Sequence, residues 1–193
     1  MRIRTVAVAL VAAFALATAC KKNEVETAQT KTTSNTPASP DDRTKPANLA
    51  SQDTEFLTKA AEGGMLEVKL GTEAQQKATS PRVKAFGDRM VVDHGRANDE
   101  LKALASEKGV TLPTTLDGDH EKKVEEFSKL SGAKFDEKFA KDMVEDHKED
   151  VDEFEKASKD LKDPDIRAWA AKTLPTLRTH LDMAKGLEDK SRR

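Results

Sequence analysis

Apolar residues recur every three or four positions along most of the chain beyond residue 51, a spacing typical of helices that bury one face. We predict four long helices, over about 52–79, 81–108, 133–161 and 164–187. Helices of this length favour an all-α bundle. The predicted inward positions include Phe56, Leu57, Ala60, Ala61, Val83, Phe86, Met90, Leu101, Phe135, Phe139, Met143, Phe154, Ile166, Trp169, Leu174, Leu177 and Leu181.

Turn signals group these helices into two hairpins. Ser80-Pro81 and Asp163-Pro164 each offer a capping side chain followed by a proline suited to the first helical turn. Gly109 ends the second helix, and residues 110–131 form a crossover with a short helical pattern over 119–130. A long crossover lets the second and third helices run parallel, which is a known four-helix topology.

A degenerate repeat lies on those two parallel helices. The segment from Phe86 to His94 recurs as the segment from Phe139 to His147, with Phe, Met, Val, Asp and His at matching positions. Both histidines fall on the apolar face of their helix, so we expect a polar layer inside the bundle core.

Counting residues from the turns places four side chains at one height. His94 is about 14 residues beyond the first turn, roughly 21 Å along the helix axis. The same distance back along the first helix reaches Glu67, and the matching count from His147 reaches His180. Gly63, Gly64 and Gly71 surround Glu67 and cost roughly 1 kcal/mol each relative to alanine. Close helix contact would offset that cost, and so would room for a ligand.

Three imidazoles and one carboxylate suit a single transition-metal ion such as zinc, copper or iron. We therefore predict Glu67, His94, His147 and His180 as candidate metal ligands, in a layer that could also bind a small ligand. Asp93 and Asp146 each precede a histidine and could accept the second ring N–H of a histidine on a neighbouring helix. Glu62 and Asp150 lie about one turn from the layer and are further candidate oxygen donors.

Two other functions fit the same residues. A buried, hydrogen-bonded His–Asp layer can fix helix packing without any metal. A metal-dependent oxidoreductase would use the same layer. The sequence shows no Ser-His-Asp ordering, no glycine-rich phosphate loop and no Cys–His pair, so we predict no catalytic residues.

Composition narrows the class of protein further. Charged residues make up 35% of the 193 positions and aromatic residues 4%, which suits solvated helices better than a β-sandwich. The net charge of −2 provides no basic field, so we expect no nucleic-acid partner.

The start of the chain predicts export. A short basic segment precedes an apolar run of signal-peptide length, and small residues then precede Cys20, the single cysteine. This arrangement resembles a bacterial lipobox, which implies a signal over 1–19 and a lipid anchor on Cys20; the alternative is a plain secretory signal. Lys21 mildly favours the outer membrane, facing the periplasm. Residues 20–51 have the composition of a disordered tether to a domain over 52–188, followed by a tail over 189–193.

Several of these motifs together resemble the bacterial domain of unknown function 4142 family. They are Glu67 in its glycine-rich helix, Met90-Val91-Val92-Asp93-His94, Gly132-Ala133-Lys134-Phe135-Asp136, Met143-Val144-Glu145-Asp146-His147, Leu174-Pro175 and His180-Leu181. The resemblance implies an exported protein with a ferritin-like four-helix bundle and no established activity. Ferritin-like di-iron proteins carry Glu-x-x-His on two helices, where this chain has Val91 and Val144. This chain therefore fits a single His-rich metal site, or no metal site, better than a di-iron site.

Overall fold

The computed structural model describes residues 49–191, and these form five α-helices and no strand. The helices are α1 (Ser51–Lys77), α2 (Pro81–Glu107), α3 (Gly118–Ser128), α4 (Gly132–Asp160) and α5 (Pro164–Ser191). The predicted all-α bundle, with a crossover and a short helix within it, is confirmed. The predictions for the signal, Cys20 and most of the tether lie outside the described residues. Within residues 49–191, no helix combines the length and apolar character needed to cross a membrane.

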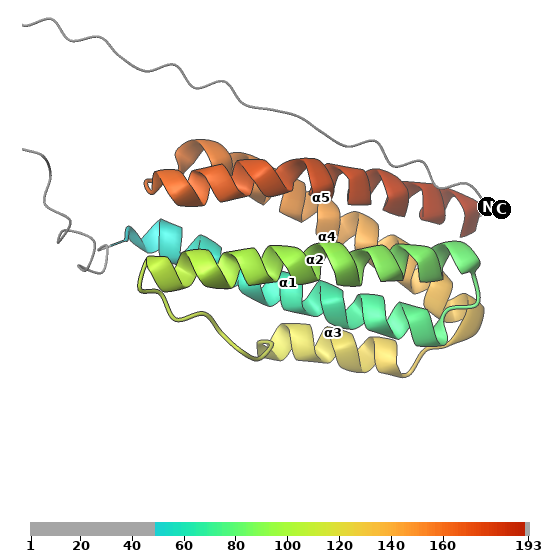
Figure 1. The fold of residues 1–193 in the computed structure, drawn as a ribbon. Coiled ribbons are helices and arrows are strands. Elements are labelled where there is room, and N and C mark those ends of the chain that lie inside the picture. The colour runs from blue at the N-terminus through green and yellow to red at the C-terminus, as the bar shows by residue number, and fades with distance from the viewer. Residues whose placement is uncertain (1–48, 192–193) are drawn as a thin grey trace, which may run out of the picture. The chain divides into compact units, whose positions relative to one another are not determined.

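The helices pack as two hairpins that face each other (Figure 1). α1 pairs with α2, α4 pairs with α5, and the hairpins meet where α2 contacts α5 and α1 contacts α4. The crossover carries α3 along the outer side of α1 before the chain enters α4 (Figure 1). The hairpins meet on two opposite sides of the bundle, and these sides differ because only the one formed by α1 and α4 has α3 beside it.

Apolar side chains form two separate clusters along the bundle. One cluster, near the α1–α2 turn, contains Leu70, Phe86, Met90, Phe139 and Met143. The other, near the α4–α5 turn, contains Phe56, Leu57, Leu101, Phe154, Ile166 and Trp169. On α2, α4 and α5 the candidate histidine falls between the residues that the helix contributes to the two clusters, and on α1 Glu67 follows Leu66, the first residue of the cluster near the α1–α2 turn. A polar layer therefore divides the core.

Two glycines bring α1 and α2 into close contact. A Cβ atom added at Gly71 would lie 2.8 Å from the carbonyl oxygen of Gly87, and one added at Gly87 would lie 2.7 Å from the carbonyl oxygen of Gly71. A Cβ at Gly64 would overlap the side chain of Asn98, whereas one at Gly63 would meet nothing within 4 Å. Gly64 and Gly71 thus serve helix contact, and Gly63 borders open space.

Two buried or partly buried carboxylates tie each hairpin to the turn of the other. Asp53, in the first turn of α1, accepts hydrogen bonds from the backbone N–H groups of Lys162 and Asp163 at 2.9 and 3.1 Å. Asp136, near the start of α4, accepts from the backbone N–H of Ser80 at 2.9 Å. Asp53 thus caps the turn between α4 and α5, and α1 itself has no side-chain cap. These reciprocal contacts fix the axial register of the hairpins.

Gly71→Ala is expected to destabilise the bundle by about 1–2 kcal/mol, because overpacking against backbone outweighs the gain in helix propensity. Gly63→Ala is the matched control and should raise the free energy of unfolding by up to about 1 kcal/mol, because its Cβ enters open space. Urea unfolding followed by circular dichroism measures both. Equal effects of the two substitutions would contradict the close contact between Gly71 and Gly87.

Candidate metal centre

The four predicted ligands meet inside the bundle, each on a different helix. Glu67 comes from α1, His94 from α2, His147 from α4 and His180 from α5. His147 and His180 are fully buried, and Glu67 and His94 are 4% and 6% exposed. Helical spacing carries each of them to the inner face at the height where the two apolar clusters separate. The expectation of a common cross-section therefore agrees with the geometry of the layer.

The three imidazole rings surround one point. Their centroids lie 5.1 to 5.6 Å apart. Nδ1 of His180 is 3.2 Å from Nε2 of His94 and 3.3 Å from Nε2 of His147. One nitrogen from each ring can be chosen so that all three lie within 4.8 Å of one another. Phe86 closes the layer on one side, with its ring centroid 5.9 Å from that of His180.

The other nitrogen of each ring has a hydrogen-bond acceptor. Nδ1 of His147 lies 3.0 Å from the carbonyl oxygen of Met143. Nε2 of His180 lies 3.0 Å from Oδ2 of Asp93, and Nδ1 of His94 lies 2.6 Å from Oε2 of Glu67. A carbonyl or carboxylate oxygen can only accept, so each outer nitrogen carries the proton when the carboxylates are ionised. The three inner nitrogens then present lone pairs.

Three lone pairs that face one another repel unless a cation lies among them. Donor atoms about 2.0–2.1 Å from a tetrahedral metal ion are roughly 3.3–3.4 Å from each other. The nitrogen separations of 3.2 and 3.3 Å match that edge length. The acceptors behind the rings are also those that orient metal-bound histidines in proteins. The donor set therefore fits a transition-metal ion of the zinc or copper type.

Glu67 divides its two oxygens between histidines. Oε2 holds His94, and Oε1 lies 3.3 Å from Nε2 of His147 without a hydrogen bond. Glu67 does not join the three histidines in one compact set of four; it forms a second candidate group with His147 and Asp150. Glu67 thus orients His94 and offers one buried oxygen without a hydrogen bond beside the rings.

The two repeated aspartates have different partners. Asp93 accepts from His180 and is held by Nε of Arg89 at 2.7 Å and by Nη2 of Arg96 at 3.3 Å. Asp146 instead pairs with Nζ of Lys123 on α3 and contacts no histidine. The outer hydrogen-bond role expected for both aspartates is therefore taken by Asp93 alone.

Burial dominates the ionisation of the layer. It raises the pKa of Glu67 to about 8 and lowers the pKa of His94 and of His180 to about 4. Burial, with the nearby His94 and His180, holds the pKa of His147 well below its ordinary value. Burial beside Glu67 holds the pKa of Asp150 well above its ordinary value. Neutral imidazoles at pH 7 are the form that binds metal ions.

Pockets reach the layer from two sides. One, of about 280 Å³, lies between α2 and α5 and is lined by His94 and His180. The other, of about 430 Å³, lies between α1, α3 and α4 and is lined by Glu67 and Asp150. Small ions therefore have two approaches to the layer, one to His94 and His180 and the other to Glu67 and Asp150.

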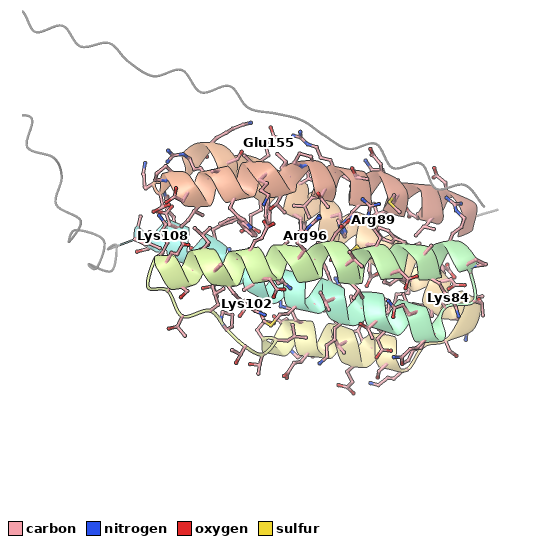
Figure 2. All side chains as sticks on the ribbon, viewed as in Figure 1. Lys84, Arg89, Arg96, Lys102, Lys108 and Glu155 are labelled. Carbon is pink, nitrogen blue, oxygen red and sulfur yellow. The ribbon has the colours of Figure 1, made fainter. Side chains whose placement is uncertain are left out.

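The basic residues that pair with Asp93 and Asp146 were not identified from the sequence. Arg89 lies four residues before Asp93, and that spacing on a helix was a usable signal for an ion pair. Figure 2 shows Arg89 and Arg96 along the side of α2 that faces α5. The pairing of Lys123 with Asp146 had no such signal, because it depends on where the crossover places α3.

Fold and site together define a class: a four-helix bundle with a crossover helix and a buried, histidine-rich polar layer. The chain belongs to the family described as Domain of unknown function (DUF4142), whose model matches residues 38–187. Comparison with curated proteins gives no match.

Solved structures share the fold. A DUF305 fragment from Deinococcus radiodurans has a TM-score of 0.65 and 14% identity, over 74% of this chain and 98% of that chain. CopM in its Cu(I)-bound form has a TM-score of 0.60 and 16% identity, over 72% of this chain and 96% of that chain. The Cu(II)-bound form gives 0.57 and 14%, over 72% and 96%. At these identities the likeness shows the helical-bundle fold alone.

Glu67→Gln is expected to flatten the pH dependence of stability in the metal-free protein. Because the pKa of Glu67 is raised from 4.5 to about 8 on folding, the folded state holds a proton that the unfolded state has released. The stability from this proton is fully present below pH 4.5 and is lost as the pH rises through 8. Wild-type protein should lose up to about 1.4 kcal/mol per pH unit from this group, which the neutral glutamine removes.

Urea unfolding in the presence of EDTA, at several values between about pH 7 and 8.5, measures this difference. Unfolded histidines are largely neutral in that range and contribute little to the slope. Asp150 remains in both proteins and has a raised pKa, so its share of the slope persists. Identical slopes for wild type and Glu67→Gln would contradict the raised pKa of Glu67.

Proposed function

We propose that this domain binds one transition-metal ion through His94, His147 and His180. The observation that carries the proposal is the convergence of three ring nitrogens, one from each histidine, with an oxygen behind each ring. The acceptors Met143 O, Asp93 and Glu67 lie behind the rings at 2.6 to 3.0 Å, and the opposite nitrogens converge. A metal ion is the partner that relieves their mutual repulsion.

The donor chemistry selects the class of ion. Imidazole nitrogens suit zinc, copper, iron and nickel, and affinity for divalent ions generally peaks at copper. Met90 and Met143 are fully buried in the apolar cluster next to the layer, and we give them no ligand role. The shared fold with CopM, solved in Cu(I)-bound, Cu(II)-bound and Ag-bound forms, also favours copper as the first ion to test.

The proposal places this domain in the bacterial envelope. The apolar leader and the lipobox-like segment before Cys20 support a lipid anchor, with the outer membrane as its site. In that position a buried site on a tethered domain would hold a metal ion in the periplasm. The proposal assigns binding, and no catalytic turnover, to the domain.

A second candidate function is a layer that only fixes packing. It is favoured by the pKa of Glu67 of about 8, because a protonated Glu67 can donate to Nδ1 of His94. Nε2–H of His94 can then donate to Nδ1 of His180 at 3.2 Å. This chain of hydrogen bonds satisfies most of the layer without a metal.

Metal analysis separates the two functions. Full-length protein without an affinity histidine tag is loaded with Cu²⁺ or Zn²⁺, desalted and analysed for metal. Wild type is expected to retain one equivalent, and His94→Gln, His147→Gln and His180→Gln should each bind at least about 100-fold more weakly. Metal at a hundred times its Kd should also stabilise wild type by about 2.7 kcal/mol, and the variants not.

Met90→Leu is the matched control, because it changes a buried neighbour of similar volume without removing an imidazole. It should keep the full equivalent of metal. Circular dichroism establishes that each histidine variant is folded before its metal content is compared. Metal binding is contradicted if wild type retains less than about 0.2 equivalents of metal, or if folded wild type and histidine variants retain the same amount. Either result would support the packing function.

A further inference from the structure

The pocket between α1, α3 and α4 is strongly acidic. Seven carboxyl side chains line it, against two lysines, and burial raises the pKa of Glu67 to about 8 and holds the pKa of Asp150 well above its ordinary value. One of the lysines, Lys123, is paired with Asp146, and the other, Lys59, is paired with Glu55 outside the pocket. A concave surface lined by one sign of charge raises the local concentration of counter-ions. We call this surface the acidic pocket.

Three potential ligands gather at the outer part of the acidic pocket. Glu62 of α1, Asp117 and His120 offer one ligand atom each, all within 4.8 Å of one another. Oδ1 of Asp117 caps α3 by accepting from the N–H of His120 at 2.8 Å. Among the described residues, the carboxylate of Glu62 has no ion pair, and Nδ1 of His120 is a buried atom 3.1 Å from Oδ1 of Asp117.

The inner part of the acidic pocket carries an independent indication of a ligand. Glu67 lines the pocket, is 4% exposed, and has Oε1 without a hydrogen bond. Oε1 lies 3.3 Å from His147, and Asp150 completes a second group of ligand atoms there. A buried acceptor with no hydrogen-bond donor is costly, and a cation that arrives through the pocket would offset that cost.

We propose that Glu62, Asp117 and His120 form an outer cation site, and that the acidic pocket is the route by which a divalent cation reaches the histidine layer. The proposal rests on the metal-binding function above and adds a second site and a direction of entry. The carboxylates attract the hydrated ion, and His120 adds the nitrogen donor that transition metals prefer. Asp150 and Glu67 then provide oxygen donors between the outer site and His147.

The opposite pocket is less suited to cation entry. Its lining has two carboxylates, Asp93 and Glu100, against Arg96 and Lys172. Both carboxylates are paired, Glu100 with Lys172 at 2.8 Å and Asp93 with two arginines. A cation approaching the layer from α2 and α5 meets no excess of negative charge.

The kinetics of metal loading test the proposal. The outer-site variant combines Glu62→Gln, Asp117→Asn and His120→Gln; asparagine keeps the cap of α3. The charge-matched control combines Asp99→Asn with Glu100→Gln near the opposite pocket. Stopped-flow mixing of full-length protein with Co²⁺, followed by its visible absorption, gives the loading rate. At low salt the histidine layer of the outer-site variant should load about tenfold more slowly, with the same final occupancy of that layer.

The control should load within about twofold of wild type, and added salt should narrow the difference for the outer-site variant. Loading of the outer-site variant at the wild-type rate, or equal slowing of the control, overturns the proposal. If wild type takes up no Co²⁺, metal binding by the layer fails instead. Zn²⁺ calorimetry then decides the outer site: a bound ion that only the outer-site variant lacks supports it, and no such ion overturns it.

Discussion

The hydrogen bonds behind the three buried imidazoles determine what the centre of this bundle can bind. His147 donates to a helix carbonyl, and His180 donates to Asp93, whose carboxylate two arginines hold. Burial keeps the rings neutral, so the outer proton of each ring leaves one lone pair that faces inward. A cation at the centre would complete this arrangement. Without one, the layer needs an additional proton, and Glu67 is the group whose raised pKa supplies it near neutral pH.

Such an arrangement requires four helices to agree in height to within a fraction of a turn. The close approach of Gly71 and Gly87 sets the contact between α1 and α2. Asp53 and Asp136 then fix one hairpin against the other, because each accepts backbone hydrogen bonds from the opposite turn. These contacts lie at the two ends of the hairpins and the layer lies between them. An axial slip of one hairpin against the other would break hydrogen bonds at both ends.

The features that follow from helical periodicity could be predicted from the sequence. The features that depend on packing between the hairpins could not. Helical spacing places His94, His147 and His180 on inner faces, and turn counting brings them to one height. It also gives the crossover helix, within a few residues of α3. The two oxygens of Glu67 could not be assigned, because small rotations of α1 decide which histidine each one meets. The partner of Asp146 could not be found either, since Lys123 reaches it only through the path of α3 along α1.

The repeat makes the layer nearly symmetric, but the two repeated aspartates have different neighbours, and this difference sets the charge on each side of the layer. Asp93 accepts a hydrogen bond from a histidine on the neighbouring helix α5. The neighbour of Asp146 on α1 is instead the carboxyl group of Glu67, which can donate a hydrogen bond only when it is protonated. Asp146 therefore takes a lysine from α3, and the side of the layer facing α3 stays acidic. A layer that served packing alone could hold an apolar side chain at position 67 at lower cost, because a buried carboxyl group is costly to desolvate even when it is neutral. A bound cation reverses that balance: the same carboxylate then neutralises charge and holds a ligand, and the acidic side becomes an approach to it.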